Sequence, residues 1–155
     1  MPVVHLSCKE EKSPAYGAVY TSPLGGVYGG YGVIVSNGTF TMQRGEISGN
    51  FTEWGDGGGI YVRGTFIMLG EEIFGNTAWG YGGGVNGSFL ISNGIIYGSN
   101  EETEAVRNTA NQGAALYGTA KHGTFNGGGF DDEFNSLGDL ETTNNTIRIV
   151  DGNSQ

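Results

Sequence analysis

The fold is decided by the segment GEISGNFTEWGDGGGIYVRGTFIMLGEEIFGNTAWGYGGGV, which runs from Gly45 to Val85. Its second half repeats the order of apolar residues, glycines and asparagines found in its first half. A Gly-Thr/Ser-Phe triplet marks each occurrence, and the pattern extends beyond the segment with Phe residues 26, 23 and 36 positions apart. Self-similarity at this period is typical of a chain that winds repeatedly over itself. The triplets are Gly38-Thr39-Phe40, Gly64-Thr65-Phe66, Gly87-Ser88-Phe89 and Gly123-Thr124-Phe125.

Positions at a fixed distance after each Phe keep one chemical type. Within each repeat the apolar positions alternate, as strands require, and the segments are too short for helices. Glycine and asparagine at the corners permit the left-handed backbone of sharp turns, and stacked Asn side chains can hydrogen-bond along a ladder. The columns are Met42, Met68 and Ile91; Ile47, Ile73 and Ile96; Gly49, Gly75 and Gly98; and Asn50, Asn76 and Ser99.

These columns predict an all-β fold, a right-handed parallel β-helix of about five coils, with three short strands in each turn of about 24 residues. Successive turns would stack about 4.8 Å apart, so that each turn buries the apolar face of its neighbour. We assign residues 1–16 to an N-terminal tail and residues 17–155 to a single β-helix domain. Residues 100–112 form an insert, expected to be a loop or one short helix. Ile147 and Ile149 should point inward from the last strand.

The segments GGGIYVRGTFIM, GEISGNFTEWGDGGG and IFGNTAWGYGGGV resemble the Gly-rich, pectin-lyase-like β-helix repeats of large bacterial surface proteins. These are polymorphic, adhesin-like proteins that are abundant in spirochaetes. The stretch NNTIRIVDG is similar to the ends of such chains, and the resemblance spans about residues 17–152. It implies an extracellular or cell-surface location. It specifies the fold more than an activity, because one fold hosts many functions.

Composition narrows the choice of partners. Sixteen acidic residues face seven basic ones, and the formal charge of −9 argues against binding nucleic acid or an anionic membrane surface. No apolar segment approaches the length of a transmembrane helix. Cys8 is the only cysteine, which excludes an internal disulfide. Its setting in VVHLSCKEEKS resembles a lipidation site, but only seven residues precede it, and an unpaired cysteine in a tail is the alternative.

Catalytic motifs are absent from the sequence. Glu46 and Glu72 share an outward column, but a glycosidase needs two carboxylates opposed across a cleft, and stacked neighbours supply no cleft. The run Asp131-Asp132-Glu133 offers oxygen ligands for Ca²⁺ without the spacing of a known binding loop. We therefore expect no enzyme, no metal site and no cofactor.

Two outward-facing surfaces are candidate sites. Trp54, Trp79 and Tyr81 fall in the same corner of consecutive repeats, where exposed rings can stack on the faces of sugars. The alternative is that the two indoles stack on each other. The outward-facing columns are polar in the first repeat and become apolar in the next two, which predicts an apolar surface patch. Either another part of this chain or another molecule should cover such a patch. The predicted interface residues are Ile67, Leu69, Phe74, Leu90, Ile95 and Tyr97.

Three functions are compatible with these observations. The first is a non-catalytic extracellular or surface module for adhesion or display, whose partner is a cell-surface glycan or protein. The second is a structural subunit that assembles head-to-tail into an extracellular filament through open strand edges at its ends. The third is an enzyme acting on polysaccharides. Glycan binding that depends on Trp54 and Trp79 would favour the first, and filaments that form with rising concentration would favour the second.

Overall fold

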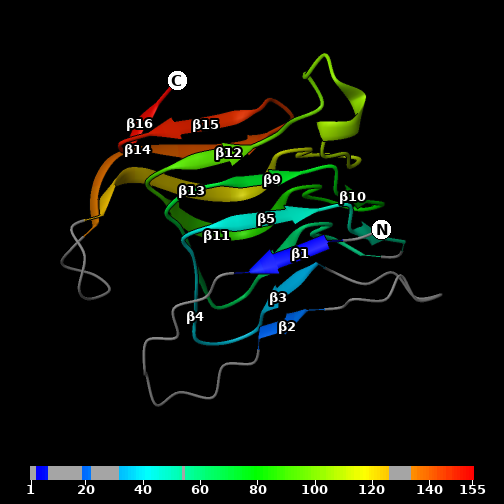
Figure 1. Ribbon diagram of the computed structural model, residues 1–155, viewed down its shortest axis with the longest axis horizontal. Helices are drawn as coiled ribbons and strands as arrows, with labels where there is room; N and C mark the ends of the chain where they lie inside the picture. The colour runs from blue at the N-terminus through cyan, green and yellow to red at the C-terminus, as the bar shows by residue number, and fades with distance from the viewer. Residues whose placement is uncertain (1–2, 7–18, 22–31, 54, 126–133) are drawn as a thin grey trace.

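The computed structural model describes residues 3–6, 19–21, 32–53, 55–125 and 134–155, with side chains from residue 32 onward. The chain is all-β, as the sequence predicts, and the described residues include one short 3₁₀ helix, η1 (Figure 1). The elements are β1 (Val3–Leu6), β2 (Val19–Thr21), β3 (Val33–Val35), β4 (Thr39–Met42), β5 (Gly45–Ser48), β6 (Phe51–Thr52), β7 (Ile60–Val62), β8 (Thr65–Met68), β9 (Glu72–Phe74), β10 (Thr77–Ala78), β11 (Val85–Ile91), β12 (Gly94–Ile96), η1 (Glu104–Val106), β13 (Leu116–Phe125), β14 (Phe134–Thr143), β15 (Ile147–Val150) and β16 (Asn153–Ser154).

The described strands form three sheets, in which parallel strands lie at the centre and antiparallel strands lie at the ends of the two larger sheets (Figure 1). One sheet has the order β1-β5-β9-β12-β15-β16, and a second pairs β10 with β6. The third has the order β14-β13-β11-β7-β3-β2, with β8 beside β11 and β4 beside β8. Parallel pairing joins β5, β9 and β12 in the first sheet and β3, β7, β11 and β13 in the third. Consecutive stretches of the chain therefore add successive strands to the same sheets.

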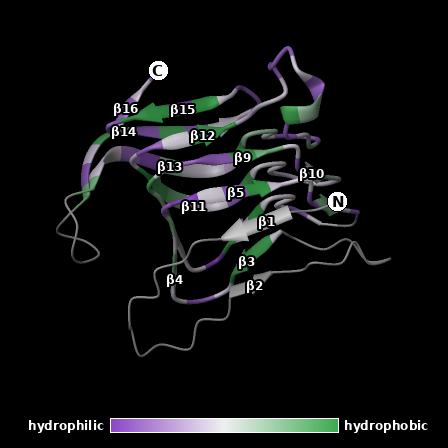
Figure 2. Ribbon diagram, in the orientation of Figure 1, coloured by the Kyte–Doolittle hydropathy of each residue, from purple (hydrophilic) through white to green (hydrophobic). Residues whose placement is uncertain are grey.

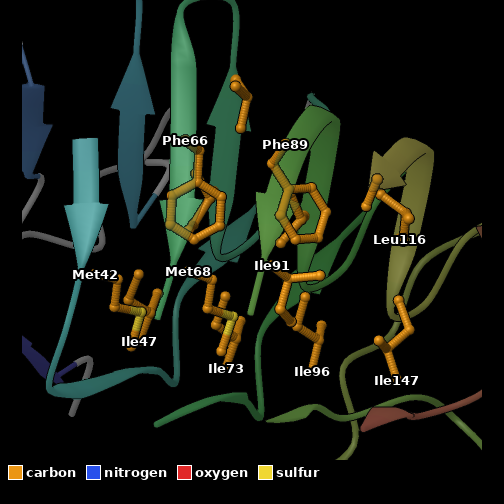
Figure 3. Close-up of a cluster of buried hydrophobic side chains, with 14 of the residues drawn as sticks. Met42, Ile47, Phe66, Met68, Ile73, Phe89, Ile91, Ile96, Leu116 and Ile147 are labelled. Atoms are coloured by element: carbon orange, nitrogen blue, oxygen red, sulfur yellow. The ribbon is translucent and has the colours of Figure 1, made fainter. Parts of the chain in front are cut away.

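The core lies between the sheets and is built from the predicted columns (Figure 3). The ring centroids of Phe40 and Phe66 are 5.6 Å apart, and those of Phe66 and Phe89 are 5.3 Å apart. Burying each large apolar side chain is worth roughly 1.5–3 kcal/mol, so these columns supply much of the stability. The other two predicted columns are also in register and buried: Met42, Met68 and Ile91, and Ile47, Ile73 and Ile96.

The fourth Gly-Thr-Phe triplet does not join the Phe column, so this part of the sequence alignment is wrong. β13 pairs with β11 so that Gly118 lies beside Gly87 and Ala120 takes the Phe position, while Phe125 is half-buried at the end of β13. Gly87 and Gly118 share φ angles of 124° and 128°, which residues with side chains rarely adopt. The backbone conformation thus sets the register. Leu140 of β14 pairs with the small Ala120 and packs against the core.

A ladder of buried asparagines runs through the molecule, and its third member is Asn108 instead of the predicted Ser99. Asn50 Nδ2 donates to Asn76 Oδ1 at 2.9 Å, and Asn76 Nδ2 donates to Asn108 Oδ1 at 3.0 Å. Each Nδ2 also donates to at least one main-chain carbonyl oxygen. All three side chains are buried, and this bonding offsets the cost of removing their amides from water.

The insert is shorter than the predicted residues 100–112. The chain leaves the ladders after Gly98, forms η1, and returns to them at Asn108; Thr109 then bridges to Thr77 in parallel. The insert therefore does contain one short helix. It is held against the turn between β14 and β15, because Asn100 Oδ1 accepts a hydrogen bond from the Thr146 N–H at 2.8 Å.

Antiparallel strands pair with the terminal parallel strands at both ends of the described sheets. At one end β1 pairs with β5 and β2 pairs with β3; at the other, β14 pairs with β13, β15 pairs with β12, and β16 follows β15. Residues 3–6 of the predicted tail thus form β1. The inward-facing Ile147 and Ile149 of β15 are buried, as predicted. Figure 2 shows that β15 is hydrophobic, whereas β13 and β14 are largely hydrophilic.

Candidate functional site: an aromatic corner

The turn between β10 and β11 carries two exposed aromatic side chains. The Trp79 side chain is 55% exposed and the Tyr81 side chain is 39% exposed. Gly82 has a φ of 70°, and a Cβ there would lie 2.5 Å from the Val85 carbonyl oxygen, so the tight turn requires glycine. Asp56 Oδ1 accepts a hydrogen bond from the Tyr81 N–H at 2.8 Å. The backbone therefore holds both rings at the surface.

Tyr81 stacks on Tyr117 of β13, with ring centroids 4.4 Å apart and ring planes 20° apart. Asn86 is the register partner of Tyr117, and its Nδ2 donates to the Tyr81 carbonyl oxygen at 3.4 Å. Sequence reasoning missed Tyr117, and aligning Gly118 with Gly87 would have placed it only in the column of Asn86 and Tyr61, at the start of the strand that follows the corner. Trp54, which the sequence assigns to the same corner, lies outside the described residues.

An open pocket of ≈ 470 Å³ lies beside the Trp79 indole. Asn111 Nδ2 donates to the Trp79 carbonyl oxygen at 2.6 Å, and the hydroxyls of Thr109 and Thr77 are 2.9 Å apart. The pocket thus combines an aromatic side chain with amide and hydroxyl groups, and none of the described residues that line it is charged. Such a surface suits an uncharged ligand with one apolar face and several hydroxyls. The pocket is lined by Ala78, Trp79, Thr109, Ala110 and Asn111.

The residues predicted to form one apolar interface lie on two sheets. Met68 of β8 and Ile73 of β9 point toward each other between these sheets (Figure 3). The outward side chains of β8 and β9 therefore face away from each other. Ile67 is buried and the remaining five residues are partly buried. One face carries Ile67, Leu69 and Leu90, and the other carries Phe74, Ile95 and Tyr97.

Glu46 and Glu72 are register partners on β5 and β9 and lie on one face of one sheet. The Ser48 hydroxyl donates to Glu46 Oε1 at 3.3 Å, and the Tyr97 hydroxyl donates to Glu72 Oε1 at 3.0 Å. Partial burial raises the pKa of Tyr97, and its bond to Glu72 acts in the same direction. The two carboxylates are thus stacked side by side, without the opposed geometry that glycoside hydrolysis uses.

Two further sequence candidates, Cys8 and the run Asp131-Asp132-Glu133, lie outside the described residues. No helix in the described part of the chain is long and apolar enough to cross a bilayer. No family model matches the chain, and no curated protein or solved structure matches it either.

Proposed function

We propose that this protein is a non-catalytic extracellular or surface-attached module for adhesion or display, and that it binds glycans at the aromatic corner of Trp79, Tyr81 and Tyr117. The observation that carries the proposal is the exposed Trp79 indole beside an open, uncharged pocket. The neighbouring Tyr81–Tyr117 stack extends the aromatic surface. Trp and Tyr present large rigid faces with a polar tip, and such groups supply most of the energy in many binding sites.

We also propose that the framework is a right-handed parallel β-helix. The in-register columns of Phe, Met/Ile, Ile and Asn support this, because like residues stack on like residues in successive parallel strands. The resemblance to repeats of bacterial surface proteins supports both the framework and the surface location. In this arrangement the aromatic corner projects from one edge of a rigid scaffold, where loops commonly carry function.

The proposal is tested by screening the purified chain on a glycan array and measuring the affinity of each hit for variants. Trp79→Ala and Tyr81→Ala should each weaken binding by roughly tenfold or more, because losing about 1.4 kcal/mol of contact energy is a tenfold change. Leu137→Ala is a matched control, since Leu137 is 49% exposed on β14 and should leave the affinity unchanged. Binding that survives Trp79→Ala, or no binding to any glycan, would count against this function.

A further inference from the structure

The chain contains four Asn-x-Ser/Thr sequences, the acceptor motif for N-linked glycans, and their asparagines differ in burial. Such acceptors normally lie on the surface, because the glycan is bulky and hydrophilic. Asn37 and Asn144 are exposed and Asn86 is half-buried, but Asn50 is only 3% exposed. The motifs are Asn37-Gly38-Thr39, Asn50-Phe51-Thr52, Asn86-Gly87-Ser88 and Asn144-Asn145-Thr146.

The Asn50 amide nitrogen, where a glycan would attach, is fully engaged in the folded chain. Its Nδ2 donates to the Ser48 carbonyl oxygen at 3.1 Å and to Asn76 Oδ1 at 2.9 Å. Because this nitrogen carries only two hydrogens, replacing one of them removes one of these bonds. A buried acceptor left without its donor destabilises the folded chain.

There is also no space beside that nitrogen. A Cβ added to Gly32 would lie 2.6 Å from Asn50 Nδ2 and 2.7 Å from Asn50 Cγ. A position that cannot admit one methyl carbon on the neighbouring backbone cannot admit a sugar ring on the amide itself. Any chain with a glycan at Asn50 must therefore break the asparagine ladder and move the backbone at Gly32.

Thr52, which completes the acceptor motif, has a buried hydroxyl that makes no hydrogen bond with any of the described residues. Its register partner in β10 is Ala78, and the Thr77–Thr109 bridge places Ala110 next in the same column. The chain thus already uses alanine at the equivalent position twice. Thr52→Val and Thr52→Ala remove the motif without removing a hydrogen bond.

We propose that N-glycosylation at Asn50 and folding are mutually exclusive, so that the native protein accepts N-linked glycans at Asn37 and Asn144 and not at Asn50. In the reaction a lipid-linked oligosaccharide pyrophosphate supplies the sugar. The bond between the sugar C1 and the pyrophosphate oxygen breaks, the Asn Nδ2–C1 bond forms, the pyrophosphate leaves with the electron pair, and Nδ2 loses a proton. The unfolded chain can undergo this reaction at Asn50, but the product cannot form the native ladder.

In the first experiment the chain is unfolded in urea and diluted. A purified oligosaccharyltransferase and its lipid-linked donor then glycosylate it until every acceptor asparagine is partly occupied. The chain is then refolded, compact and aggregated fractions are separated, and glycopeptides from each fraction are counted. Occupancy at Asn50 should be at least tenfold lower in the compact than in the aggregated fraction. Occupancy at Asn37 and Asn144 should be equal in the two fractions. Equal occupancy at Asn50 would overturn the proposal.

A second measurement uses secretion from a cell that performs N-glycosylation, with a signal sequence added to the full chain. Thr52→Val and Thr52→Ala should each raise the yield of secreted, compact protein several-fold. Thr39→Val, which removes the exposed Asn37 acceptor, should leave the yield unchanged. In a host without N-glycosylation all four chains should fold with similar melting temperatures. A secreted, compact wild-type chain with a glycan at Asn50 would again contradict the proposal.

Discussion

At the scale of the residue, the environment of Tyr97 couples the fold to pH. The Tyr97 hydroxyl donates to Glu72 Oε1 at 3.0 Å, and its ring packs edge-on against Phe74 with centroids 6.1 Å apart. Burial raises the pKa of Tyr97 most, the bond to Glu72 and the charges of Glu72 and Glu101 raise it further, and Arg148 opposes them. The folded chain therefore holds this proton more tightly than the unfolded chain does.

This shift predicts a loss of stability in alkaline solution. The stabilisation linked to Tyr97 is fully present below its unfolded pKa of 10.0 and is lost as the pH rises through the higher folded pKa. We expect the free energy of unfolding, measured by urea titration on either side of that pH, to fall more steeply in the wild type than in Tyr97→Phe. The variant lacks the proton but keeps the ring, so equal slopes would refute this assignment.

At the scale of the element, the interior strands could be predicted because stacked strands repeat one residue type at a regular interval. The columns through Phe66 and Ile73 are confirmed on this basis. Two columns were extended wrongly, to Ser99 and to Phe125, because residues 99–107 break the interval. Gly118 and Gly123 are each followed by Thr, so residue type could not decide between them, whereas backbone conformation does. The antiparallel end strands contain no recurring column, so their pairing could not be predicted, although the alternation of Ile147 and Ile149 did predict the inward face of β15.

A substitution at Gly87 of β11 tests whether backbone conformation fixes the register of the strands. A Cβ on Gly87 would lie 2.5 Å from the Val62 carbonyl oxygen, at a φ of 124°. Gly87→Ala should therefore cost about 2–4 kcal/mol in urea unfolding, from backbone strain and displacement of β7.

Gly70→Ala is the matched control for this substitution. Gly70 does not have a positive φ. A Cβ added to Gly70 would contact only the Gln43 carbonyl oxygen, at 3.2 Å. The expected loss is about 1 kcal/mol or less. If the two variants lost the same stability, the register would not depend on the conformation of Gly87.

At the scale of the whole molecule, the antiparallel end strands predict how the chain behaves in self-association, because they cover edges of the parallel strands. Among the described strands, the parallel strands β3, β5, β12 and β13 each have an antiparallel neighbour, whereas β4 pairs only with β8 and β6 only with β10, so most of the edges that a head-to-tail filament would use are already paired. We expect a monomer across a concentration series followed by light scattering and negative-stain electron microscopy. Filaments of the full chain would instead support the structural-subunit function.

A truncated chain shows whether β1 is responsible for this behaviour. Deleting residues 1–6 removes the partner of β5 and leaves a row of free N–H and C=O groups on an otherwise intact sheet. The truncated chain should associate at concentrations where the full chain stays monomeric. If both chains scattered light equally, pairing by β1 would have no part in keeping the protein monomeric.

The closure of the C-terminal end has a consequence for biosynthesis. β15 pairs with β12 and β14 pairs with β13. Both strands lie in residues 134–150, so they are synthesised after the strands with which they pair. Translation adds about 5–20 residues per second, and incomplete chains with unpaired edges are prone to aggregate. A stalled or truncated product that lacks β14 and β15 would present two such edges to its neighbours. The time between synthesis of the parallel strands and synthesis of residues 134–150 thus sets how long each nascent chain is prone to aggregate.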